Sequence, residues 1–182
     1  MSKLGKKPII IPKDTKVKLE SGRIFLTGPK GSKELTLNDK IFAATIVDDK
    51  SLILKLIKKN ETSSMLWGTT RSIINSAIIG VSEGYEKILE LNGVGFRAIL
   101  KGNILILQIG FSHTISYKIP EGIKAAVEKS TIIKINGIDK ELVGKVSSEI
   151  KMLKPVEPYK GKGIKERGQY VLRKEGKKKK ND

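Results

Sequence analysis

The residues best suited to bind a ligand lie near the C-terminal end of the chain, in the stretch Pro155-Val-Glu-Pro-Tyr-Lys-Gly-Lys-Gly-Ile164. A tyrosine is followed there by lysines that alternate with glycines: Tyr159, Lys160, Gly161, Lys162 and Gly163. Lysine offers a point charge for a phosphate, glycine has no Cβ to hold a sugar–phosphate backbone away, and tyrosine can stack on a base. The pattern favours a loop that binds a polyanion, and a solvated glycine–lysine loop is the alternative.

The charge balance points to the same class of partner. The 182 residues include 36 Lys and Arg against 19 Asp and Glu, a net charge of +17. Residues 1–82 carry +8, residues 83–153 only +2, and residues 154–182 carry +7 in a short segment. A surface this basic attracts polyanions. The like-charge run Lys177–Lys180 is expected to be disordered without a partner.

Several classes of function are disfavoured by what the chain lacks. It has no cysteine, so it has no disulfide and no thiolate metal site, and its one histidine, His113, excludes a multi-histidine metal cluster. His113 lies beside a turn without an evident carboxylate or nucleophile, so a surface histidine is expected rather than a catalytic one. No run approaches the roughly 20 apolar residues of a membrane span. We expect a soluble intracellular protein that is not an enzyme and needs no cofactor, no membrane and no small-molecule substrate.

The chain contains a loose internal repeat. Three pairs of segments match in order: Ile24–Leu37 with Ile106–Ile119 at an offset of 82, Lys50–Leu56 with Lys129–Ile135 at 79, and Trp67, Gly68 and Ile74 with Val143, Gly144 and Ile150 at 76. Repeats in this order indicate one structural unit used twice.

Each copy is expected to have its strands first and a helix last. In the first copy, strands are predicted near 16–20, 23–27, 33–37, 41–47 and 52–57, with turns at Ser21-Gly22 and Asp48-Asp49 and a helix that starts near Ser63. In the second, strands are predicted near 85–91, 96–101, 104–109, 114–119, 123–128 and 131–135, and a helix from Asp139 that Pro155 ends.

These elements predict an α+β fold of two similar domains, each an antiparallel sheet with one helix packed on one face. The domains are expected at residues 1–82 and 83–154, with a hinge at Ser82-Glu83-Gly84, and residues 155–182 are expected to form a basic C-terminal extension. Gly161 and Gly163 would then lie outside both packed units.

Two other segments allow more than one interpretation. Asn92-Gly-Val-Gly-Phe-Arg97 is either a bulged hairpin turn or a means of bringing Arg97 to a phosphate. The basic residues Lys3, Lys6 and Lys7 around Gly5 form either an RNA-contacting arm or a solvated one. Trp67 and Phe96 are expected in the core rather than as stacking platforms.

Four stretches resemble the family of the sixth protein of the bacterial-type large ribosomal subunit. They are Ser2–Ile9, Gly93–Ala98, Gly110–His113 with Ile119-Pro120, and Pro158–Ile164. The resemblance spans the chain and implies two similar sheet-plus-helix domains. It implies binding to large-subunit rRNA near the sarcin–ricin region and the stalk base, beside neighbouring ribosomal proteins and where translational GTPases dock. The ribosome would be cytoplasmic or organellar.

The resemblance also implies which residues contact rRNA. They are Tyr159, Lys160, Gly161, Lys162 and Gly163, with the neighbouring basic residues Lys154, Lys165, Arg167, Arg173 and Lys174, and Arg97. Glu166 departs from the family pattern, which has an aromatic residue there, and a carboxylate suits phosphate poorly. The alternatives are a non-ribosomal RNA-binding module and a protein of anionic membranes, although the latter would need a basic amphipathic helix.

Overall fold

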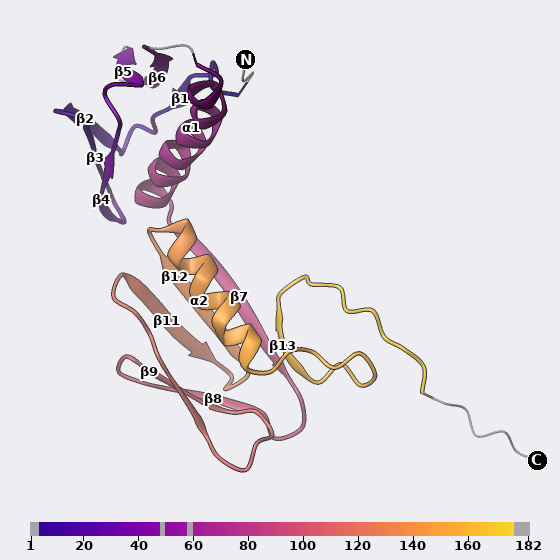
Figure 1. Ribbon diagram of the computed structural model, residues 1–182. Coiled ribbons are helices and arrows are strands. Elements are labelled where there is room, and N and C mark those ends of the chain that lie inside the picture. Colours follow the sequence, from indigo (N-terminus) through magenta and orange to yellow (C-terminus); the bar gives the residue numbers. More distant parts are fainter. Residues whose placement is uncertain (1–3, 48–49, 58–59, 177–182) are drawn as a thin grey trace, which may run out of the picture. The chain divides into compact units, whose positions relative to one another are not determined.

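The computed structural model describes residues 4–47, 50–57 and 60–176, and in it the chain forms two compact units (Figure 1). The N-terminal unit holds the described residues up to Gly84 together with Ile138–Lys140, and the C-terminal unit holds Tyr85–Gly137 and the residues from Glu141 onward. Lys3, the predicted turn at Asp48-Asp49 and the run Lys177–Lys180 lie outside the described residues. Within the described ranges, two helices and several antiparallel sheets confirm the predicted α+β fold of two similar units.

The N-terminal unit has two sheets rather than the one expected. Its elements are β1 (Ile9–Ile10), β2 (Lys16–Glu20), β3 (Arg23–Gly28), β4 (Gly31–Thr36), β5 (Phe42–Val47), β6 (Ser51–Leu56) and α1 (Glu61–Ser82). The antiparallel sheets have the orders β1-β6-β5 and β2-β3-β4. Both contribute to one core with α1, since Leu26 of β3, Leu54 of β6 and Ile78 of α1 are all buried in the same cluster. Strand patterning shows which side chains point inward, but it does not show how the strands are shared between sheets.

Helix α1 begins earlier than predicted. Asn60 precedes its first residue, and Ser63 occupies the third helical position instead of the cap. The Asn60 backbone N–H donates to Ser63 Oγ at 2.8 Å, which is half of a capping box. One turn further on, Trp67 is buried as expected, and its indole N–H donates to the Leu54 carbonyl at 2.9 Å.

The C-terminal unit repeats this topology. Its elements are β7 (Tyr85–Asn92), β8 (Arg97–Lys101), β9 (Ile104–Gln108), β10 (Ile115–Lys118), β11 (Ile123–Glu128), β12 (Ile132–Gly137), α2 (Lys140–Leu153) and β13 (Gly163–Glu166). The sheets have the orders β10-β9-β8 and β11-β12-β7-β13, which match those of the N-terminal unit except for the added β13.

Strand register corrects the offset of the repeat. Leu52 lies opposite both Ile9 and Ile46 in the first unit, as Ile133 lies opposite both Leu89 and Val127 in the second. Leu52 and Ile133 are therefore equivalent, and they are 81 positions apart instead of the predicted 79. A shift of two residues leaves every strand side chain on the same face, so the apolar pattern could not distinguish these offsets.

Residues beyond Pro155 are partly inside the C-terminal unit, and the expectation that Gly163 lies outside it was wrong. Gly163–Glu166 form β13, which pairs antiparallel with β7 (Figure 1). Ile164 is fully buried in the core of the unit, beside residues such as Leu91. The strand is only four residues long and has no long apolar alternation, so sequence periodicity gave little sign of it.

The equivalent edge in the N-terminal unit cannot accept such a strand. Ile11 donates its N–H to the carbonyl of Lys50, the residue before β6. The backbones of Pro8 and Pro12 therefore face away from β6, towards the free edge, and a proline has no N–H to donate to a further strand. The Arg71 side chain of α1 donates to the Lys7 and Pro8 carbonyls at 3.4 and 3.2 Å. Prolines and an arginine thus block in one copy the edge that β13 occupies in the other.

Candidate nucleic-acid interface

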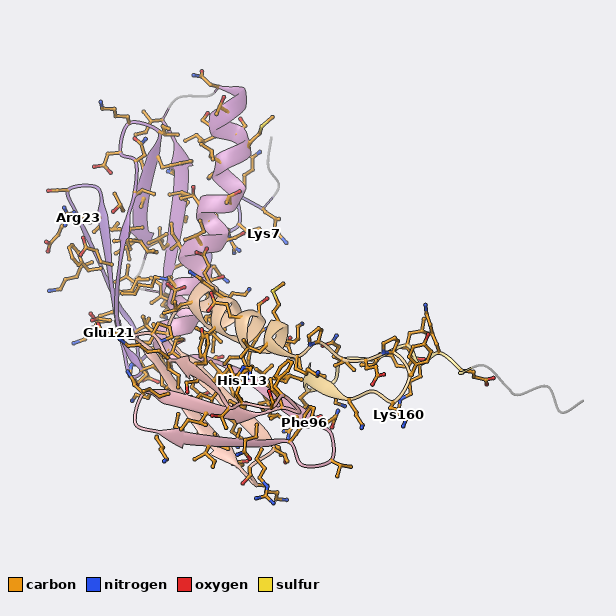
Figure 2. All side chains as sticks on the ribbon, turned by 60° about the horizontal axis from the view of Figure 1, so that its bottom comes forward. Lys7, Arg23, Phe96, His113, Glu121 and Lys160 are labelled. Atoms are coloured by element: carbon orange, nitrogen blue, oxygen red, sulfur yellow. The ribbon has the colours of Figure 1, made fainter. Side chains whose placement is uncertain are left out.

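The predicted phosphate-binding loop has a defined backbone structure. The Glu157 N–H donates to the Lys162 carbonyl at 2.8 Å, and the Gly161 N–H donates to the Glu157 carbonyl at 3.0 Å. Gly161 has φ +69°, the left-handed conformation that lets the chain turn back. Lys160 and Lys162 are exposed, and Figure 2 shows Lys160 on a loop that leads away from the sheets of its unit.

The C-terminal tail returns to this loop. The Lys174 N–H donates to the Pro158 carbonyl at 2.9 Å. The Arg173 guanidinium covers Gly161, because its Nη2 lies 3.3 Å from where a Cβ on Gly161 would be. We call the exposed side chains of these two segments the loop–tail surface: Tyr159, Lys160, Lys162, Arg173 and Lys174. Four of the five are cationic, and the same segments hold two carboxylates, Glu157 and Glu175.

The sequence predicted that Gly161 and Gly163 leave their backbones open to a ligand. In the structure neither of them does. Gly161 is covered by Arg173, a flexible side chain that can move. Gly163 has φ +142°, and a Cβ there would lie 2.6 Å from both the Pro155 carbonyl oxygen and the Val156 Cα. Gly163 therefore permits β13 to start directly against the backbone that precedes it, which is a structural role.

Lys165 and Arg167 are held by a carboxylate on the neighbouring strand. Lys165 Nζ lies 3.3 Å and Arg167 Nε 3.1 Å from the two oxygens of Glu90 on β7. The hydrogen bond from Arg167, with help from Lys165, keeps the pKa of Glu90 below its ordinary value although partial burial opposes the shift. These two cations tie β13 to β7 and are less available to phosphate than the lysines of the loop. The unexpected carboxylate, Glu166, is paired in turn with Lys87 at 2.7 Å.

The remaining two predicted residues, Arg97 and Lys154, come earlier in the sequence of the C-terminal unit. Arg97 is exposed at the start of β8, in the other sheet, after a turn in which the buried Phe96 donates its N–H to Gly93 at 3.2 Å. Lys154 follows α2, and its carbonyl accepts the Ile164 N–H at 2.9 Å. Its ammonium lies 4.5 Å from the ring centroid of Phe111.

Sequence reasoning missed the aromatic residues beside Lys154. Phe111 and His113 lie on the exposed turn after β9, as expected for His113, with their rings stacked at 6.0 Å between centroids. The only signal was the Gly110–His113 stretch, which had served for the family resemblance. Among residues 4–47, 50–57 and 60–176, no group of acidic, histidine or cysteine side chains could hold a metal ion. Within the same ranges, neither helix has the length and apolarity to cross a membrane.

Comparison with known proteins places the chain in a family. Residues 92–167, which include β8 to β13, match the family described as Ribosomal protein L6. The large ribosomal subunit protein uL6 of Beijerinckia indica subsp. indica is 44% identical over 179 residues, 98% of this chain and 100% of that protein. The uL6 proteins of Staphylococcus saprophyticus and Staphylococcus epidermidis are 46% and 45% identical, each over 97% of this chain and 98% of their own. The chain therefore belongs to the uL6 family of large ribosomal subunit proteins.

Proposed function

We propose that this chain binds large-subunit rRNA chiefly through phosphate contacts from the loop–tail surface, as a structural constituent of the large ribosomal subunit in the cytoplasm. The family is one of structural proteins rather than enzymes. The observation that carries the proposal is the return of the tail to the loop through Lys174 and Pro158, which gathers cations from two segments on one surface.

This arrangement suits a polyanion better than the same charge spread along a free chain. Two backbone hydrogen bonds close the loop, so the backbone that carries Lys160 and Lys162 is ordered before binding and adds little to the ordering cost. Tyr159 is 54% exposed between them and Pro158, where its ring is open to a base or a sugar. Phosphate contacts of this kind set the position and register of the protein on its RNA.

The number of free cations sets the expected salt dependence. Lys165 and Arg167 are not counted, because Glu90 already pairs with both. The four cations of the loop–tail surface are Lys160, Lys162, Arg173 and Lys174, and one phosphate contact is expected from each. With a slope of about −0.7 to −0.9 per contact, affinity should fall about 100-fold between roughly 50 and 200 mM salt.

The proposed position of the chain within the large subunit comes from the family resemblance. It locates the chain near the sarcin–ricin region and the stalk base, beside other large-subunit proteins, where it would support the docking site of translational GTPases. Hydroxyl-radical footprinting of large-subunit rRNA with the full chain tests this placement. Protection confined to distant helices would refute it.

A matched pair of double variants tests the role of the loop. Lys160→Ala with Lys162→Ala removes two loop cations, and Lys118→Ala with Lys124→Ala removes two exposed cations from β10 and β11 of the same unit. In filter binding to a large-subunit rRNA fragment, the loop variant should bind more weakly, with a salt slope less steep by about 1.4–1.8. The control should bind nearly as the wild type does. Equal losses in both variants would refute the loop–tail surface, and circular dichroism should show that both remain folded.

A further inference from the structure

The turn after β9 exposes two aromatic rings that the phosphate-binding surface does not use. Phe111 is 44% exposed, and His113 beside it is exposed as well. Their ring planes are inclined by only 19°, so they form a stacked pair. The residues next to them in the sequence, Ser112 and Thr114, are polar and exposed.

The orientation of this pair is supported from within the C-terminal unit. Gly110, with φ +79°, starts the turn directly above the buried ring of Phe96, and a Cβ on Gly110 would lie 3.1 Å from that ring. A second contact comes from Lys154, whose ammonium lies over the Phe111 ring at 4.5 Å from its centroid, in cation–π range. The backbone of Lys154 is held in place, because its carbonyl accepts the N–H of the buried Ile164.

We propose that Phe111 and His113 form a stacking platform for one unpaired nucleobase of rRNA, with Lys154 placed to meet an adjoining phosphate. This inference rests on the proposed function and adds a contact that reads an unstacked base. Aromatic faces stack on any base, and a fixed pair of rings loses little conformational freedom on binding. The cation beside the rings and the net charge of +17 favour a nucleic acid over a protein partner.

The test uses the full chain, a large-subunit rRNA fragment and four variants. Phe111→Ala and His113→Ala each remove one ring, Phe111→Tyr keeps an aromatic ring, and Ile99→Ala removes a side chain of similar exposure, 47%, from β8. Each alanine variant at the platform should weaken binding about 5- to 150-fold, the usual effect of removing a stacking aromatic residue. Phe111→Tyr and Ile99→Ala should bind as the wild type does.

Salt titration distinguishes stacking from charge. Stacking releases no counterions, so the salt slope of Phe111→Ala should equal that of the wild type, whereas loss of loop lysines should reduce it. If the wild type binds the fragment and both alanine variants bind it equally well, the platform is refuted while the proposed function stands. If the wild type does not bind the fragment, the proposed function itself is refuted, and the platform with it. Variants that bind RNA normally but are depleted from large subunits purified from cells would show that the rings meet a protein, which also overturns the inference.

Discussion

Replacing Gly163 with alanine is expected to detach β13 from β7. The φ of +142° is one that residues with a Cβ rarely adopt, and the added Cβ would lie 2.6 Å from backbone atoms of Pro155 and Val156. Backbone atoms cannot turn aside as the end of a side chain can. The conformation costs on the order of 1–3 kcal/mol, and the overlap adds about 1–3 kcal/mol. Gly163→Ala should therefore lower the free energy of unfolding by about 2–6 kcal/mol. The loss cannot exceed the free energy that holds β13 in the sheet, because the strand would then detach and the strain would be released.

Hydrogen exchange measures this loss where it occurs. The Ile164 and Arg167 amides bond to the Lys154 and Ile88 carbonyls, both at 2.9 Å, and their exchange protection should fall sharply in the variant. Thermal unfolding followed by circular dichroism reports any global part, at about 4–8 °C per kcal/mol for a unit of this size.

Two glycine variants serve as controls. Gly176 has open space around an added Cβ, so Gly176→Ala should leave stability unchanged. Gly161 has φ +69° but meets only the flexible Arg173, so Gly161→Ala should cost about 1–2 kcal/mol. Equal amide protection in Gly163→Ala and Gly176→Ala would refute the structural role of Gly163.

Two further predictions concern ion pairs and the N-terminal arm. Glu90→Gln should lower stability at neutral pH by removing the charge that Arg167 and Lys165 meet. Since these cations lower the pKa of Glu90 in the folded protein, its contribution is fully present above the ordinary value of 4.5 and is lost as the pH falls through the lowered pKa. Urea-unfolding curves of variant and wild type should therefore converge in acid, and a gap that persists there would contradict this account. Arg71→Met should remove the bonds to Lys7 and Pro8, lower stability by about 1 kcal/mol and speed exchange of the Lys7 amide. An unchanged exchange rate would show that the arm is held by other contacts.

The residue pattern alone determined the main elements of both units. Alternating apolar residues located the strands, and helical spacing located α1 and α2, because these periods depend only on which face of an element is buried. Trp67 and Phe96 were also correctly predicted in the core. The predicted helix start at Ser63 was two residues late, since a serine suits either the cap or the third position of a capping box.

Only the tertiary structure decided the offset between the two copies in the sequence and the partners of the site residues. The repeat offset of 81 follows from strand register, which a two-residue shift leaves invisible in the apolar pattern. The pairing of β13 with β7 made Gly163 a packing residue and brought Lys165 and Arg167 to Glu90. Local sequence supplied the charges, the rings and the glycines. The partner of Arg167, Glu90, lies 77 positions away in the sequence, and such distant contacts depend on how the whole unit packs rather than on neighbours along the chain.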